Sequence, residues 1–123
     1  MKFHYEIIDK ENYLLVVMGG EYSLEDMFSM MKAVANECSQ KNYTKVFADM
    51  RLVVVTDIPV IERFSMGKGV ADVFGTRVKV AAIMEARIIH RQRIGEMAAT
   101  NRFANYRNFS EEEEKEAMDW LFS

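Results

Sequence analysis

The feature that most limits the possible folds is an alternation of two apolar patterns along the chain. Short apolar runs are typical of β-strands, and segments whose apolar residues recur every three or four positions are typical of amphipathic helices. The runs that predict strands cover residues 3–8, 13–18, 45–50, 77–84 and 103–109. Because a predicted helix follows each strand after the first, right-handed crossovers are expected to build a mostly parallel sheet.

The first two predicted strands, 3–8 and 13–18, are separated by four polar residues. A connection this short predicts an antiparallel hairpin. Gly19 and Gly20 are expected to end the second strand, and residues 51–56 fit either a strand or a tucked loop. The predicted fold class is therefore α/β, with a single mostly parallel five-stranded sheet, an antiparallel N-terminal hairpin strand, and the order β-β-α-β-α-β-α-β-α.

Two of the predicted helices are preceded by capping sequences. Ser23, followed by Asp26, resembles a capping box before the helix over 24–38, with aspartate in place of glutamate or glutamine. Ser110 and Glu113 form a complete capping box before the last helix. In such a box each side chain bonds to the backbone N–H of the other residue, so both pairs predict where a helix begins.

The two helices in the middle of the chain have less regular patterns. In the first, Ile61 and Phe64 are expected to begin the apolar stripe, and Gly67 and Gly69 are expected to make the helix irregular or broken. The second is predicted over about 87–100. The residues expected on its buried face are Ile89, Ile94, Met97 and Ala98.

The length and charge of the chain limit its possible partners. A length of 123 residues suits one domain, so residues 1–123 are predicted to form a single domain. The formal net charge of −3 gives no bulk attraction to nucleic acid or to an anionic membrane. No apolar run is long enough to span a bilayer, and residues 1–9 lack the pattern of a signal peptide. The single cysteine, Cys38, cannot form an internal disulfide, and a reducing, cytoplasmic location is expected.

Three stretches of the chain match a pattern of small α/β domains. The first, 45–51, is a strand that ends in Asp-Met-Arg, and the second, 77–83, reads as the next parallel strand. The third, 106–121, combines a strand, a phenylalanine, an acidic run and an Ala-x-x-Trp-Leu ending. Together with the order of elements, these stretches resemble the SpoIIAA-like branch of the STAS/SEC14 group of small bacterial domains. The resemblance implies a non-enzymatic domain, because relatives act as anti-sigma-factor antagonists or as sensing and scaffolding modules.

The family's phosphorylation motif is the main point of departure. In the anti-sigma-factor antagonists, a phosphorylatable serine begins the helix after the third strand, within an Asp-x-x-x-Asp-Ser-Ser-Gly-like sequence. That motif is missing here, and the nearest hydroxyl at a comparable place belongs to Thr56, which precedes Asp57. Thr56 is therefore the candidate modification site.

Candidate ligand-binding residues follow the parallel strands, because α/β sheets bind ligands at the carboxyl ends of their strands. Arg51 follows the third strand, and Arg87, His90 and Arg91 begin the third predicted helix. Arginine forks and helix N–H groups suit an anion such as phosphate or carboxylate. The alternative is a solvated basic surface that pairs with nearby glutamates such as Glu85.

Two functions stay open at this point. One is a regulatory module that binds a protein partner and self-associates as a homodimer, and the other is a module that binds a small anionic or lipid-like ligand. No residues have the spacing of a metal site, a catalytic triad or a cofactor motif, so no metal, cofactor or enzymatic activity is expected. The methionines Met27, Met30, Met31 and Met66 fit a methionine-rich core or, if Met30 is exposed, an apolar binding surface.

Overall fold

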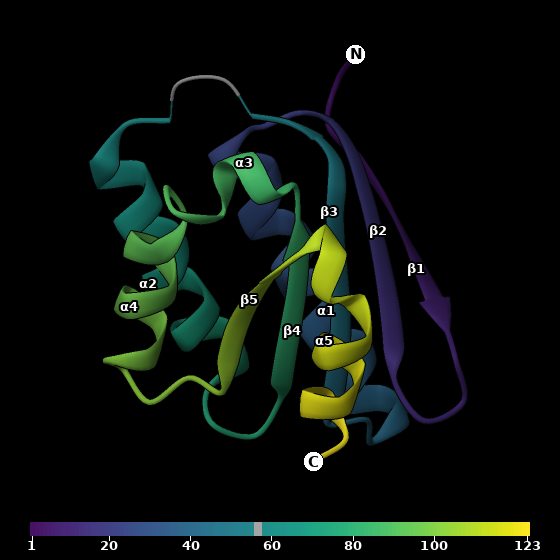
Figure 1. The fold of residues 1–123 in the computed structure, drawn as a ribbon. Coiled ribbons are helices and arrows are strands. Elements are labelled where there is room, and N and C mark those ends of the chain that lie inside the picture. Colours follow the sequence, from purple (N-terminus) through teal and green to yellow (C-terminus); the bar gives the residue numbers. More distant parts are fainter. Residues whose placement is uncertain (56–57) are drawn as a thin grey trace.

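The structure is a computed structural model and describes residues 1–55 and 58–123. Its strands form one five-stranded sheet in the order β1-β2-β3-β4-β5 (Figure 1). β1 is antiparallel to β2, and each later pair of neighbours is parallel. The predicted α/β class, with its mostly parallel sheet and antiparallel hairpin, is thereby confirmed. The strands are β1 (His4–Asp9), β2 (Leu14–Glu21), β3 (Lys45–Val54), β4 (Lys79–Met84) and β5 (Tyr106–Ser110).

The helices cover the two faces of the sheet unequally. Because the strand order follows the sequence, right-handed crossovers place the connecting helices on one face, and α5 lies on the other (Figure 1). Among the described residues, no helix is both long enough and apolar enough to cross a membrane. The helices are α1 (Leu24–Lys41), α2 (Val60–Phe74), α3 (Ala86–Ile89), α4 (Arg93–Thr100), the 3-10 helix η1 (Glu111–Glu113) and α5 (Glu114–Leu121).

The unequal cover gives the protein one large core and one small core. The large core joins the sheet to α1 and α2, and Met30 lies in it with 5% of its surface exposed, so the methionine-rich core is confirmed and the methionine surface is wrong. Cys38 also lies in this core, and burial raises the pKa of its thiol to about 11. The small core joins the sheet to α5 and consists of Phe47, Ala81, Ile83, Phe109, Ala117 and Leu121.

β2 runs through Gly19 and Gly20, so the prediction that these glycines end the strand is wrong. Gly20 has a φ of +84°, and a Cβ there would overlap the carbonyl oxygen of Lys2. Next to it, the Glu21 N–H donates a hydrogen bond to the Met1 carbonyl at 2.8 Å. The missing side chain therefore lets the N-terminal segment pass close to β2, and strand pairing outweighs the low strand propensity of glycine.

α2 is continuous over Val60–Phe74, so the predicted break at Gly67 and Gly69 is wrong. A Cβ on Gly67 would overlap the carbonyl oxygen of Gly95 in α4, and a Cβ on Gly69 would overlap the ring of Phe28 in α1. Both glycines therefore allow neighbouring helices to approach closely. This packing outweighs the helix propensity that each glycine loses.

The segment predicted as one helix over 87–100 forms two helices, α3 and α4, so the described residues contain one α-helix more than predicted. A turn at residues 90–92 separates them, and its Gln92 is buried. β5 begins at Tyr106, not at 103, because a turn precedes it in which Phe103 has a φ of +67°. Met97 is 59% exposed on α4, so its predicted burial is wrong.

Both predicted capping sequences stand at helix starts in the structure. The Ser110–Glu113 capping box is complete, with each side chain bonded to the backbone of the other residue. At the start of α1, the Ser23 hydroxyl oxygen accepts a hydrogen bond from the Asp26 N–H at 3.3 Å. These contacts join residues three apart, which is why the sequence alone predicts them.

Asp9, at the end of β1, ties the hairpin to the end of α1. Its Oδ1 accepts hydrogen bonds from the Glu11 N–H at 2.7 Å and from the Tyr43 hydroxyl at 2.8 Å. Its Oδ2 lies 3.0 Å from Lys41 Nζ. The Glu11 N–H, together with Lys41 and Tyr43, lowers the pKa of the Asp9 carboxyl.

We expect Asp9→Asn to destabilise the protein near neutral pH and to have a smaller effect in acid. A carboxyl whose pKa is lowered in the folded state stabilises the fold above its ordinary pKa of 3.8, and this contribution is lost as the pH falls through the lowered value. Urea unfolding across the acid range measures the free energy of unfolding, with Glu6→Gln on the same strand as the control. A difference between wild type and Asp9→Asn that does not change with pH would contradict this role.

Candidate functional site

β3 extends past β4 at the carboxyl edge of the sheet. It pairs with β4 as far as Asp49 and with β2 as far as Val54. Within this extension β3 contains a bulge, because Val17 of β2 lies opposite Asp49 whereas Gly19 lies opposite Leu52. β3 therefore has one residue more than β2 in this interval, and the bulge changes which side chains face the core.

Beyond the bulge, two apolar side chains of β3 face solvent. Val53 is only 2% exposed, whereas Leu52 and Val54 are 70% and 52% exposed. Of the two interpretations of residues 51–56, the strand is right as far as Val54. The bulge thus turns aliphatic side chains outward at the edge where α/β sheets bind their ligands.

The first turn of α2 adds a second pair of exposed apolar side chains, Val60 at 59% and Ile61 at 71%. Phe64, one turn later, is 41% exposed. The prediction that Ile61 and Phe64 begin a buried stripe is therefore wrong. We name the four residues Leu52, Val54, Val60 and Ile61 the apolar rim.

Tyr22 connects the two halves of the apolar rim. Its N–H donates a hydrogen bond to the carbonyl of Val54 at 3.1 Å, and its hydroxyl donates one to Glu62 Oε1 at 3.4 Å. Burial, with the nearby Glu62 carboxylate, raises the pKa of Tyr22 to about 12, so the hydroxyl stays a donor at neutral pH. The end of β3 and the start of α2 are therefore both hydrogen-bonded to Tyr22, through its backbone N–H and its hydroxyl.

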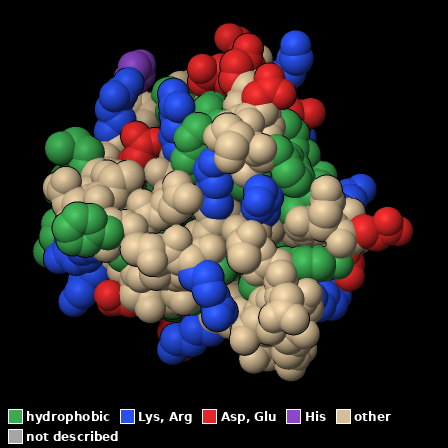
Figure 2. All heavy atoms as spheres, turned by 90° about the horizontal axis from the view of Figure 1, so that it is seen from below, with side chains coloured by type: hydrophobic (Ala, Val, Ile, Leu, Met, Phe, Trp, Pro, Cys, Tyr) green, Lys and Arg blue, Asp and Glu red, His purple; other side chains and the backbone are tan. Residues whose placement is uncertain are grey.

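Several acidic residues lie on the elements that form or adjoin the apolar rim. Glu25 and Asp26 lie in the first turn of α1, which follows Tyr22, and Glu62 lies in the first turn of α2. Glu21, at the end of β2, is 3.8 Å from the amino group of Met1. At the opposite end of the molecule, many Lys and Arg side chains are spread over the surface together with groups of Asp and Glu side chains (Figure 2).

Arg51, a predicted ligand-binding residue, is held by two carboxylates. Its Nε and Nη2 bond to the two carboxylate oxygens of Asp49 at 3.0 and 2.8 Å, and its Nη1 lies 3.3 Å from Glu114. The bond to Asp49 raises the pKa of the guanidinium. Arg51 thus joins β3 to the first residue of α5, and this paired arrangement suits positioning of α5 better than ligand binding.

The other predicted ligand-binding residues fall in different surroundings. Arg87 Nε pairs with Glu85 at 2.7 Å, and Arg91 is exposed in the turn after α3. His90 lines a surface cavity of about 440 Å³ between α3, α4 and β5. Thr56 lies outside the described residues, and its modification stays a prediction.

The surface cavity at His90, which we name the outer cavity, collects polar side chains from α4 and β5. Arg93 and Glu96 come from α4, and Arg107 and Asn108 come from β5. Two of its carboxylates accept backbone hydrogen bonds: Glu96 from Asn108 at 2.6 Å, and Glu113 from Ser110 at 3.0 Å. The outer cavity therefore has anchored carboxylates and a group of basic side chains.

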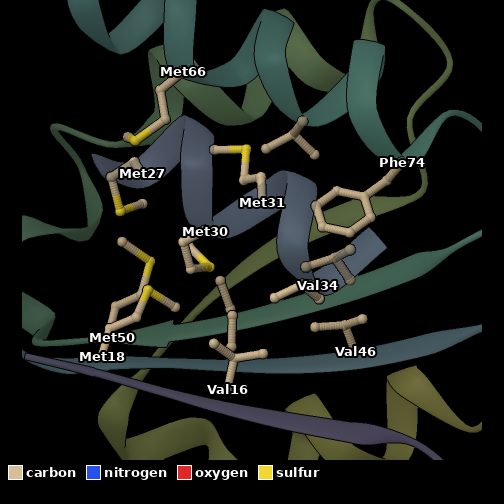
Figure 3. Close-up of a cluster of buried hydrophobic side chains, with 14 of the residues drawn as sticks. Val16, Met18, Met27, Met30, Met31, Val34, Val46, Met50, Met66 and Phe74 are labelled. Carbon is tan, nitrogen blue, oxygen red and sulfur yellow. The ribbon is translucent and has the colours of Figure 1, made fainter. Parts of the chain in front are cut away.

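A second cavity, which we name the methionine cavity, lies inside the large core and measures about 50 Å³. Figure 3 shows methionines of α1, α2, β2 and β3 whose side chains approach one another there. Its apolar wall is almost wholly aliphatic and thioether, and its polar wall includes Gln92, Glu96, Tyr106 and Asn108. The methionines that line it are Met18, Met27, Met30, Met31, Met50, Met66 and Met84.

No family model and no curated protein matches the sequence. Solved structures do match. An anti-sigma factor antagonist from Mycobacterium paratuberculosis is 9% identical with a TM-score of 0.66, over 99% of this chain and 96% of that chain. An uncharacterised protein of the DUF3478 family with a SpoIIAA-like fold, from Shewanella loihica, is 16% identical with a TM-score of 0.51, over 98% of this chain and 94% of that chain. The present chain has the SpoIIAA-like fold.

The SpoIIAA-like fold confirms, at the level of architecture, the resemblance seen in the sequence. Arg107 and Asn108 are not among the site residues predicted from the sequence, although both precede the carboxyl end of the last parallel strand. The apolar rim is not predicted either. The sequence feature that could have indicated the rim is the apolar run 52–55, which follows Arg51 beyond the end of the predicted strand 45–50.

Proposed function

We propose that this chain is a regulatory module that binds a partner protein through the apolar rim. One observation carries the proposal: four aliphatic side chains, two at the end of β3 and two in the first turn of α2, are between 52% and 71% exposed. Burying aliphatic surface yields about 25 cal/mol per Å², so a group of exposed aliphatic side chains favours association. The solved relative described as an anti-sigma factor antagonist supports a protein as the partner.

The charges beside the apolar rim indicate which kind of protein surface fits it. Glu25, Asp26 and Glu62 favour a partner that presents apolar side chains flanked by lysine or arginine. A second copy of this chain, docked rim to rim, would bring acidic groups toward acidic groups. We therefore propose a basic, apolar segment of another protein as the occupant.

We expect the double variant L52D/I61D to lose at least about tenfold in affinity for this partner, because carboxylates in the rim would have to be desolvated on binding. To find the partner, wild type, L52D/I61D and Phe103→Asp are each immobilised and incubated with a lysate of the cells that naturally contain this protein. Phe103 is 81% exposed in the turn between α4 and β5, so it is a matched control. Proteins retained by wild type and by the control, but not by the rim variant, are identified.

Direct binding of the purified candidate then decides the proposal. Isothermal titration should show a negative heat-capacity change with wild type and a lost or weakened interaction with L52D/I61D. Retention that is equal for all three proteins would overturn the role of the rim. Native mass spectrometry tests the other occupant. If wild type forms a homodimer that L52D/I61D does not form, and no other protein is retained, the partner is a second copy of this chain and not a basic segment of another protein.

A further inference from the structure

The methionine cavity and the outer cavity meet at one wall. Glu96 of α4 and Asn108 of β5 line both cavities. The four residues of the apolar rim line neither cavity. Of the described residues, only Glu96 and Asn108 are shared by the apolar methionine cavity and the polar outer cavity.

The polar groups of this wall are only partly satisfied by hydrogen bonds within the protein. The Asn108 N–H donates to Glu96 Oε2 at 2.6 Å, and Asn108 Nδ2 donates to the Gln92 carbonyl at 3.2 Å. The side-chain oxygen of Asn108 is buried, and no group within residues 1–55 and 58–123 donates a hydrogen bond to it. A buried acceptor without a donor costs free energy, so opening the wall at Asn108 loses less than opening a fully bonded wall.

The outer cavity has the chemistry to bind an anion. It is lined by His90, Arg93 and Arg107 and by the carboxylates of Glu96 and Glu113, which accept backbone hydrogen bonds. Across the described part of the chain, none of the three basic side chains forms an ion pair. The Arg107 guanidinium lies 4.9 Å from the centre of the Phe109 ring, which leaves its N–H groups able to donate elsewhere. Paired arginine forks fit the two oxygens of a carboxylate.

The methionine cavity has the chemistry to bind an aliphatic chain. Its volume of about 50 Å³ is below the roughly 150 Å³ of an engineered apolar cavity that binds benzene. Methionine side chains have three rotatable bonds and repack readily, so the seven methionines can make room for inserted methylene groups.

We propose that the two cavities form one binding site for an aliphatic carboxylate. The carboxylate lies between Arg93 and Arg107, and the chain passes Asn108 into the methionine cavity. This function is additional to partner binding at the apolar rim and does not depend on it.

The first test is a titration of the full-length protein, labelled with carbon-13 in the methionine methyl groups, with monomeric decanoate. Saturable shifts are expected for the methyl groups of Met30 and Met66, and Met1, which is exposed and lines neither cavity, serves as an internal control. Arg93→Ala and Arg107→Ala should each weaken decanoate binding about tenfold, as expected for loss of a charge-assisted hydrogen bond. Arg91→Ala, outside the cavity, should leave it unchanged.

A second variant tests the inner half of the site without removing a charge. Val34 lines the methionine cavity, and Val34→Ile adds one methylene group to it. We expect this variant to stay folded, with an unchanged or higher Tm, and to bind decanoate at least about tenfold more weakly. The site is overturned if cavity methionine signals do not shift, if decanol binds as tightly as decanoate, or if Val34→Ile binds as wild type does.

Discussion

Replacing Gly67 with alanine is expected to lower the free energy of unfolding by about 2 kcal/mol, although alanine is the better helix former. In α2, a Cβ at this position would overlap the carbonyl oxygen of Gly95 and lie 3.0 Å from the Cβ of Ala98. The backbone of α4 would have to move away from α2. Forcing extra volume into a well-packed contact costs about 1–3 kcal/mol or more, which exceeds the gain of about 1 kcal/mol in helix propensity.

The direction of the stability change in Gly67→Ala shows whether helix propensity or the close packing of α2 on α4 dominates at this position. Urea unfolding should show a lower midpoint at an unchanged slope for Gly67→Ala. Lys68→Ala, at the exposed next position of the same helix, should change stability by no more than about 0.5 kcal/mol. A stabilised Gly67→Ala variant would mean that propensity dominates and that α2 and α4 do not pack as closely as the structure shows.

Leu121→Ala is expected to cost about 3 kcal/mol and to release α5 before the rest of the protein unfolds. Leu121 is fully buried, and it belongs to the six-residue core that attaches α5 to the sheet. Truncating a buried leucine removes transfer free energy and leaves a cavity, and so small a core has few neighbours that can refill it.

Trp120, the single tryptophan of the chain, reports directly on this release. Its ring lies 5.8 Å from the Phe109 ring, and Lys79 Nζ lies 4.4 Å from its centre. In Leu121→Ala, tryptophan fluorescence should change at lower urea than far-ultraviolet circular dichroism, whereas Asp119→Ala, an exposed neighbour, should keep the wild-type transitions. Coincident and unshifted transitions in Leu121→Ala would show that α5 contributes little to stability.

Much of the candidate site could not be predicted from the sequence. The ligand-binding role of Arg51 stays a prediction, but the sequence does not show that its guanidinium pairs with Asp49 and Glu114. Glu114 is far away in the chain, so only the packing of α5 brings it to Arg51. Asn108 was not predicted because its importance depends on the two cavities that meet beside it.

The sequence by itself determined the number and order of the strands, the antiparallel hairpin and the start of the last helix. Each depends on spacing within one short segment, such as the three positions between Ser110 and Glu113. The tertiary structure alone decided that β3 bulges and exposes Leu52, that Gly67 continues a helix, and that the methionines enclose a cavity. These features arise from contacts between segments distant in the chain, and the free energy of such contacts exceeds the local preferences that a sequence pattern records.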